Sequence, residues 1–587
     1  MPLIERQVSL MNKKTYGRIL KYLKPYMPLI VLSLIAAAAT TLLSLYVPIL
    51  AGRAIDHIIG PGQVGFSKIS DILLQMLIVI LLAAVFQWIM NVINNKITYK
   101  VVKDIRKKAF DHIQSLPLSY LDSRQYGEFV SRIVGDIDQF SDGLLMGFSQ
   151  LFTGVVMIVG TIVFMFTLNI AITIVVVVLT PLSLFVAAFI AKKTYKLFIR
   201  QSEMRASLTG LVEEMVGNEK VVQAFSYEDR AIERFDKINE ELSEASLKAT
   251  FFSSLTNPCT RFVNNLVYAS VGIIGAMFVI KGRLTVGELT CFLSYATQYT
   301  KPFNEISGVV TELQNAVACA ARVFELIDAE PETPDRPDAV VLKDVKGAVE
   351  LKNVNFSYVP DRKLIQNLNL LVKPGMRVAI VGPTGCGKST VINLLMRFYD
   401  TDTGTIKVED NDIRNIRRNS LRENYGMVLQ ETWLKAASIK ENIAYGREAT
   451  DEEIIAAAKA THAHSFIKRL PQGYDTILGE DGGSLSQGQK QLLCITRVML
   501  SLPPMLILDE ATSSIDTRTE LRVQRAFAKL MKGRTSFIVA HRLSTIMEAD
   551  MILVMKDGNI IEQGSHESLM KLGGFYSELF NSQYKQV

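Results

Sequence analysis

The chain has 587 residues, which is too long for a single hydrophobic core and predicts at least two domains. Hydrophobic residues make up 49% and charged residues only 21%, which excludes an ordinary soluble enzyme and indicates a mixed membrane and soluble chain. The net charge of +6 is small for this length, so we expect no nucleic-acid partner. The five cysteines are scattered without C-x-x-C spacing, which predicts neither a disulfide framework nor a zinc site.

The first half of the chain alternates long apolar runs with basic clusters. The runs are uncharged or nearly so, and each is long enough to cross a bilayer as a helix. Buried helices of a large soluble core would not explain the regular placement of the basic clusters between them. The predicted spans are residues 29–50, residues 72–93, two spans between Asp142 and Lys192 with a tight turn near 167–169, residues 262–280 and residues 289–310.

The basic clusters also predict an orientation. They precede the first span and follow the second and the fourth, whereas the other connections carry little charge. Because positive loops stay on the cytoplasmic side, we expect both termini in the cytoplasm and the chain in the plasma membrane. The sixth span carries Lys301 and Glu305, four residues apart. Either they neutralise each other, or they line a substrate cavity with Tyr295, Gln298 and Tyr299.

Two long polar segments, residues 94–142 and 192–261, keep apolar residues at helical spacing. We interpret them as cytoplasmic extensions of the spans. Each has a break near its middle, at residues 117–120 and 224–227, and these breaks would be the cytoplasmic tips.

A proline-rich polar stretch, residues 329–337, ends the membrane half. After it, apolar runs at 349–358, 377–381, 505–508 and 536–540 alternate with helical stretches, which is typical of an α/β phosphate-loop domain. The predicted fold is therefore a membrane α-helical domain of six transmembrane helices fused to an α/β P-loop nucleotide-binding domain. The predicted boundaries are 1–328 for the membrane domain, 329–346 for the linker and 347–587 for the nucleotide domain.

The strand at 377–381 leads into a glycine-rich turn that fits G-x-x-x-x-G-K-[ST]. The glycines let the backbone approach phosphates, and the N–H groups at the start of the next helix point at them. Lys388 adds a positive charge, and the Ser389 hydroxyl can bind Mg²⁺. The turn consists of Gly382, Pro383, Thr384, Gly385, Cys386, Gly387, Lys388, Ser389 and Thr390.

A second nucleotide motif is the apolar strand at 505–508 followed by two carboxylates. Asp509 would hold the metal through water, and Glu510 would polarise the attacking water. By itself a strand ending in Asp-Glu is often a solvated turn. Downstream of a phosphate loop in the same domain, the catalytic interpretation is favoured.

With the segment Ser484–Gln489 the chain resembles an ATP-binding-cassette exporter half-transporter, as in bacterial heterodimeric multidrug exporters, over almost its full length. The resemblance implies ATP and Mg²⁺ as ligands and assigns roles to single residues. Tyr358 would stack on adenine, Gln430 would touch Mg²⁺ and His541 would contact the γ-phosphate. Glu480 would meet the cytoplasmic tips, and Asp516 would communicate across the dimer. Without the resemblance, each would pass as an ordinary structural residue.

The signature departs from the family pattern L-S-G-G-Q. Here Gln487 replaces a glycine, with a side chain and a narrower backbone range, whereas Ser486, Gly488 and Gln489 match. In the family this motif caps the ATP that the opposite subunit binds, and altered signatures accompany asymmetric pairs. We therefore expect a second half-transporter as partner, in a heterodimer, with a homodimer as the alternative.

The expected function is ATP-driven outward transport of a small amphipathic, drug-like or lipid-like substrate across the lipid bilayer. The resemblance implies that two cassettes close around two ATP molecules and that closure reaches the spans through the two tips. A homodimeric lipid or peptide exporter, or an ATP-gated channel or regulator, is the alternative. Glu510 and His541 argue against a channel, because gating alone does not need efficient turnover. The six spans exclude a soluble cassette protein.

Overall fold

The structure is a computed structural model, and it describes residues 14–58, 64–359, 362–429, 432–483, 485–509, 516–539 and 546–584. The chain forms two compact units. The helical unit comprises Met1–Gln114 and Gln125–Ala329, and the α/β unit comprises Ser115–Arg124 and Glu330–Val587. The short segment Ser115–Arg124 thus belongs to the α/β unit, although the chain before and after it belongs to the helical unit.

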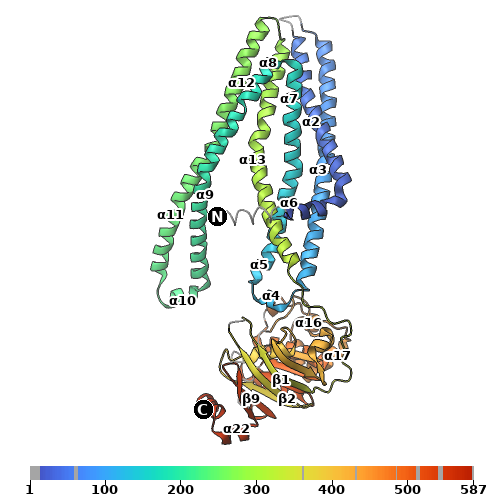
Figure 1. The fold of residues 1–587 in the computed structure, drawn as a ribbon, viewed down its shortest axis with the longest axis vertical. Helices are drawn as coiled ribbons and strands as arrows, with labels where there is room; N and C mark the ends of the chain where they lie inside the picture. The colour runs from blue at the N-terminus through green and yellow to red at the C-terminus, as the bar shows by residue number, and fades with distance from the viewer. Residues whose placement is uncertain are drawn as a thin grey trace. The chain divides into compact units, whose positions relative to one another are not determined.

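The helical unit is built from long helices that run roughly alongside one another (Figure 1). Within it α2 packs against α3, α7 and α13, and α9 packs against α11 and α12. In chain order its elements are the 3₁₀ helix η1 (Lys24–Tyr26), α2 (Met27–Asp56), α3 (Phe66–Ile113), α5 (Tyr126–Val130), the π-helix η2 (Ser131–Asp136), α6 (Ile137–Met146), the π-helix η3 (Gly147–Leu151), α7 (Phe152–Leu168), α8 (Ile170–Leu179), α9 (Pro181–Gly217), α10 (Glu219–Ala224), α11 (Glu228–Ser254), α12 (Thr256–Ile280) and α13 (Val286–Asp328).

All six predicted spans fall on helices. Among the described residues, four continuous helical stretches are long and apolar enough to cross a membrane, and they contain the predicted spans 1, 2, 3 and 5. The fourth predicted span is divided between α8 and α9, and the sixth lies within α13. The four stretches are Lys14–Asp56, Phe66–Ile113, Tyr126–Leu168 and Glu228–Ile280.

The predicted breaks at 167–169 and 224–227 are confirmed, whereas three of the four residues of the break predicted at 117–120 are helical, in α4 (Leu118–Asp122), and the break lies just before them. Asn169 is extended, and its side chain accepts the N–H groups of Ala171 at 3.0 Å and Ile172 at 3.2 Å, which caps α8. α3 has 48 residues, far more than a bilayer crossing requires, so the predicted extension of this span is also confirmed. α10 and α11 are separated at Ser226, whose φ is +50°.

The two tyrosines of the sixth predicted span lie in the interior of the helical unit. Tyr295 is fully buried in an apolar cluster, and its hydroxyl donates to the Leu45 carbonyl at 2.6 Å. Tyr299 is also buried and packs edge-on against Phe303. These two tyrosines therefore belong to the buried core of the helical unit. Lys301 is exposed, and the side chain of Glu305 lies outside the described residues.

The α/β unit holds two sheets, drawn in yellow to red in Figure 1. Six strands have the order β10-β9-β3-β8-β7-β6, all parallel except β10, and four antiparallel strands have the order β2-β1-β4-β5. The strands are β1 (Val349–Phe356), β2 (Ile365–Val372), β3 (Arg377–Val381), β4 (Thr403–Val408), β5 (Asn411–Asp412), β6 (Tyr425–Val428), β7 (Met505–Asp509), β8 (Thr535–Val539), β9 (Met551–Lys556) and β10 (Asn559–Gly564).

Both faces of the six-stranded sheet are covered, as expected for parallel strands. Val378 and Ile380 face a core shared with the four-stranded sheet, whereas Ala379 faces a second core formed with the helices. The helices of this unit are α4 (Leu118–Asp122), α14 (Lys388–Leu395), α15 (Arg418–Glu423), α16 (Ile439–Ile443), α17 (Asp451–Ala460), α18 (His464–Ile467), α19 (Gln487–Ser501), α20 (Thr517–Met531), α22 (His566–Leu572) and α23 (Phe575–Tyr584), with 3₁₀ helices η4 (Ile413–Asn415), η5 (Gly473–Asp475) and η6 (Glu480–Gly482).

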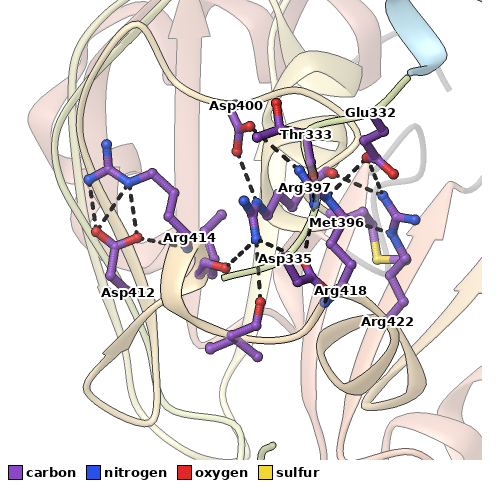
Figure 2. Close-up of polar contacts among 12 residues, drawn as sticks. Glu332, Thr333, Asp335, Met396, Arg397, Asp400, Asp412, Arg414, Arg418 and Arg422 are labelled. Carbon is purple, nitrogen blue, oxygen red and sulfur yellow. Dashed lines mark hydrogen bonds and ion pairs between the residues drawn. The ribbon is translucent and has the colours of Figure 1, made fainter. Parts of the chain in front are cut away.

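The predicted linker is packed onto the α/β unit by a group of charges that we call the linker clasp: Glu332, Asp335, Arg418 and Arg422 (Figure 2). The buried Arg418 guanidinium lies 3.0 Å from a carboxylate oxygen of each acid. Arg422 donates to Glu332 at 3.3 Å. The linker backbone at Val340 also pairs with the main chain of Asn415. This segment is therefore a fixed part of the unit.

Candidate nucleotide site

The glycine-rich turn follows β3 near the middle of the six-stranded sheet and leads into α14. Gly382 has a φ of +154°, and a Cβ at this position would lie 2.2 Å from the carbonyl oxygen of Met555. Gly387 has a φ of +102° and caps α14 in the left-handed conformation. The turn therefore needs glycine at both places, for close backbone approach at one and for conformation at the other.

Lys388 is the first residue of α14, and its side chain folds over the turn. Its ammonium donates to the carbonyl oxygens of Gly382 at 2.8 Å and Pro383 at 2.9 Å. The first N–H groups of a helix have no acceptor within the helix, so they and the ammonium form a positive cradle. Ser389 is exposed in this first turn, whereas Thr390 is buried.

The carboxylate motif lies at the same edge of the sheet. Asp509 is the last residue of β7, which is separated from β3 by β8, and all three strands are parallel. Because parallel strands end at one edge, the Asp509 carboxylate and the glycine-rich turn share that edge. Glu510, Gln430 and His541 lie outside the described residues.

Tyr358 lies just beyond β1 and is 46% exposed, so part of its side chain is accessible to a ligand. Asn393 of α14 donates to its hydroxyl at 3.1 Å. The rings of Phe356 and Tyr399 pack edge-on against it, with centroids 4.9 Å and 5.0 Å away. The residue is thus held next to the helix that begins at the glycine-rich turn.

The signature residues form the N-terminus of α19. Ser486 caps this 15-residue helix in a capping box with Gln489, and Gly488 is buried. Gln487 is the first helical residue, and its helical backbone conformation is open to any residue, so its narrower backbone range carries no strain. Its side chain donates to the Thr432 hydroxyl at 3.2 Å, close in sequence to Gln430.

Five further sequence-predicted residues have described positions. Glu480 begins the short helix η6 and is exposed. Asp516 caps α20, and the hydrogen bond from the Thr519 N–H lowers the pKa of its carboxyl. The Cys386 thiol is buried inside the glycine-rich turn, and this burial raises its pKa. The turn residues Thr384 and Gly385 are exposed.

Two residues beside the site were not predicted from the sequence: Asn393 and Tyr399, which hold Tyr358 from two sides. Asn393 lies about one and a half turns into α14, the helix that follows the glycine-rich turn. Its position in that helix could have indicated that it lies near the nucleotide site. Tyr399 gave no signal of its own, because its contact with Tyr358 depends on the return of the chain after α14.

The described donors fit a magnesium ion bound together with a nucleotide. The Ser389 hydroxyl and the Asp509 carboxylate offer oxygen atoms at one edge of the sheet. Among the residues with described positions, no group of three or more His, Cys, Asp or Glu side chains could hold a metal alone. Mg²⁺ commonly combines one or two protein oxygens with substrate phosphates, which matches this sparse set.

Comparison with known proteins extends these observations to the whole chain. The family model of the ABC transporter transmembrane region matches residues 30–303, and the ABC transporter model matches residues 365–513. A fatty acid ABC transporter ATP-binding/permease protein of Mycobacterium bovis is 42% identical over 88% of this chain and 82% of its own length. The uncharacterized ABC transporter ATP-binding protein YfiC of Bacillus subtilis is 38% identical over 98% of this chain and 95% of its own length.

A solved structure gives the same result for the fold. The bacterial Atm1-family ABC exporter with ATP bound has a TM-score of 0.76 and 30% sequence identity, covering 96% of this chain and 98% of its own. The similarity therefore spans both units together. With its transmembrane region and its ATP-binding region in one polypeptide, the chain belongs to the ABC transporters and has the exporter fold.

Proposed function

We propose that this chain is a half-transporter that couples ATP binding and hydrolysis to outward transport of a small amphipathic, drug-like or lipid-like substrate. The observation that carries the proposal is the cradle formed by Gly382, Gly387 and Lys388, with Asp509 at the same sheet edge. The fatty acid transporter of Mycobacterium bovis, 42% identical, supports a lipid-like substrate.

The residues of the cradle have distinct roles in this proposal. Lys388 releases the turn carbonyls, to which it now donates, and binds the β- and γ-phosphate oxygens. Tyr358 offers its ring to the adenine. Ser389, Asp509 and Gln430 hold Mg²⁺, which neutralises charge on the phosphates when it is bound. Glu510 accepts a proton from the attacking water, and His541 orients the γ-phosphate.

The second ATP-site surface comes from the partner half. Ser486, Gln487, Gly488 and Gln489 lie at the N-terminus of α19, which favours an anion, and we assign them to the ATP that the partner binds. A monomer would then complete neither site.

We further propose that the partner is a different chain and that the pair lies in the plasma membrane with its termini in the cytoplasm. The proposed division remains 1–328, 329–346 and 347–587.

ATPase assays on the co-purified native dimer in lipid nanodiscs test this function. We expect Glu510→Gln to lower turnover by about 100-fold or more, because a positioned general base contributes at least that much, while ATP binding remains. Lys388→Ala should weaken ATP binding itself by about tenfold or more, since it removes a charged hydrogen-bond donor.

Two exposed residues of α22 supply matched controls. Glu567→Gln and Lys571→Ala change the same residue types far along the sequence from the cradle and should leave turnover and binding as in the wild type. If Glu510→Gln retained wild-type turnover, the role given to Glu510 would be wrong. If Glu510→Gln and Lys388→Ala also abolish ATP-dependent transport in vesicles, and the two controls do not, the ATPase activity is connected to export.

A further inference from the structure

The short segment Ser115–Arg124 is held by the α/β unit at two points. The N–H of Glu332, a member of the linker clasp, donates to the Ser115 carbonyl at 2.7 Å. At the other end, the hydroxyl of Tyr399 donates to the Asp122 carboxylate at 2.6 Å, where α4 ends. The chain on either side of this segment belongs to the helical unit, so any movement of the segment is passed on covalently.

Tyr399 follows α14, the helix that begins at the nucleotide cradle. Between them the chain turns sharply at Arg397, which has a φ of +49° and is buried. Its guanidinium fixes this turn by donating to Asp400 at 3.0 Å and to the Ile413 carbonyl at 3.0 Å (Figure 2). Tyr399 thus stands in a short loop whose neighbours on both sides are immobilised.

The ring of Tyr399 also touches the proposed adenine platform. It packs edge-on against Tyr358 with centroids 5.0 Å apart and against Phe356 with centroids 5.6 Å apart. One side chain therefore contacts Tyr358 with its ring and Asp122 with its hydroxyl. A base that stacks on Tyr358 restricts that ring and with it the ring of Tyr399.

The chemistry of the hydroxyl suits such a link. Burial, followed by the hydrogen bond to Asp122, raises the pKa of the Tyr399 phenol. The phenol therefore keeps its proton at physiological pH and donates to a carboxylate. Hydrogen bonds to charged groups are short, and they weaken steeply with distance and misalignment, so a small ring displacement changes this one appreciably.

We propose that Tyr399 is a positioning residue that links adenine stacking on Tyr358 to the placement of Ser115–Arg124, through its hydrogen bond to Asp122. The inference rests on the proposed ATP site and adds to it a route by which the base, and not only the phosphates, reaches the helical unit. The three residues involved, Tyr358, Tyr399 and Asp122, all belong to the α/β unit.

Hydrogen–deuterium exchange of peptides covering residues 115–124 tests the link in the whole protein in nanodiscs. The peptides are compared without ligand, with a saturating non-hydrolysable ATP analogue and Mg²⁺, and with saturating Mg-tripolyphosphate, which has phosphates but no base. We expect the ATP analogue to slow exchange by about tenfold, the order of one hydrogen bond to a charged group, and tripolyphosphate to have little effect.

Tyr399→Phe and Asp122→Ala should each abolish the ATP-dependent difference, because each removes one partner of the hydrogen bond, and the double variant should be no worse than either. Tyr474→Phe is the matched control, because it removes a hydroxyl bonded to His464 at 2.8 Å in the same unit. A merely structural role would change exchange equally with and without nucleotide. ATP occupancy of each variant is measured in parallel, so a failure of the ATP site itself is recognised separately.

Two results would overturn the proposal: an ATP-dependent difference that persists in Tyr399→Phe, or one that tripolyphosphate reproduces in full. If Tyr399→Phe failed to fold, Asp122→Ala would decide alone, since Asp122 is exposed and its truncation removes no buried side chain.

Discussion

Gly382 shows how a single backbone position can govern the nucleotide cradle. Its φ of +154° is unfavourable for other residues, and a Cβ there would collide with the Met555 carbonyl at 2.2 Å. Gly375 also has a positive φ, +79°, but has nothing within 4 Å of an added Cβ. Comparing the two glycines therefore separates the energetic cost of a positive φ from the cost of a steric clash with the added Cβ.

We therefore predict that Gly382→Ala destabilises the α/β unit by about 3 kcal/mol, because the main chain of β9 must shift to admit the methyl group. It should also weaken ATP binding. Gly375→Ala should cost only about 1 kcal/mol, the penalty of the left-handed conformation, and leave ATP binding intact. Denaturant unfolding and nucleotide titration measure both effects. Equal losses in the two variants would contradict the role of the contact.

At the scale of elements, the sequence predicted some of the strands that carry a strong apolar pattern, but not β9, whose four central residues are all buried. The apolar run at 377–381 became β3 with the same bounds, and the run at 505–508 became β7 with one further residue. β4 was missed because only Ile406 and Val408 are buried along it, which is too short an alternation to recognise. Local pattern therefore identified the strands at the site better than those of the antiparallel sheet.

The linker clasp could not be predicted, because its partners are far apart in the chain. Arg418 and Asp335 are separated by 83 residues, and their pairing depends on the folded unit. For the same reason Tyr358 could be assigned from the family motif, whereas its neighbour Tyr399 could not. Sequence reasoning thus identified the residues of the cradle but not the side chains that connect it to the linker and to α4.

We predict that Arg418→Ala releases the linker. The change leaves Glu332 and Asp335, each 29% exposed, without their common partner, at a cost of about 2 kcal/mol after allowance for solvent. Because cleavage follows the population of the open form, proteolysis within residues 330–346 should become about 30-fold faster. Arg417→Ala, which removes an exposed neighbouring arginine, should leave the rate unchanged. Equal cleavage rates in both variants would show that the clasp does not hold the linker.

At the scale of the whole molecule, the open question is whether the second half-transporter is a copy of this chain. Gln487 carries the argument for a different chain. Its backbone is helical and unstrained, so the argument depends on the side chain, which in this structure donates to Thr432. In a homodimer both ATP molecules would meet this glutamine. In a heterodimer only the ATP bound by the partner would meet it, and the Glu510 site would receive the partner's own signature.

We predict that this chain expressed alone has little ATPase or transport activity and that co-expression with its native partner restores both. In the pair, Glu510→Gln should abolish turnover, because it removes the general base of the competent site. Gln487→Gly should leave turnover near wild type, because it alters only the site that the partner's nucleotide occupies. In a homodimer Gln487→Gly would change both sites and therefore the measured rate. A stable dimer of this chain alone with full ATPase and transport would rule out the heterodimer.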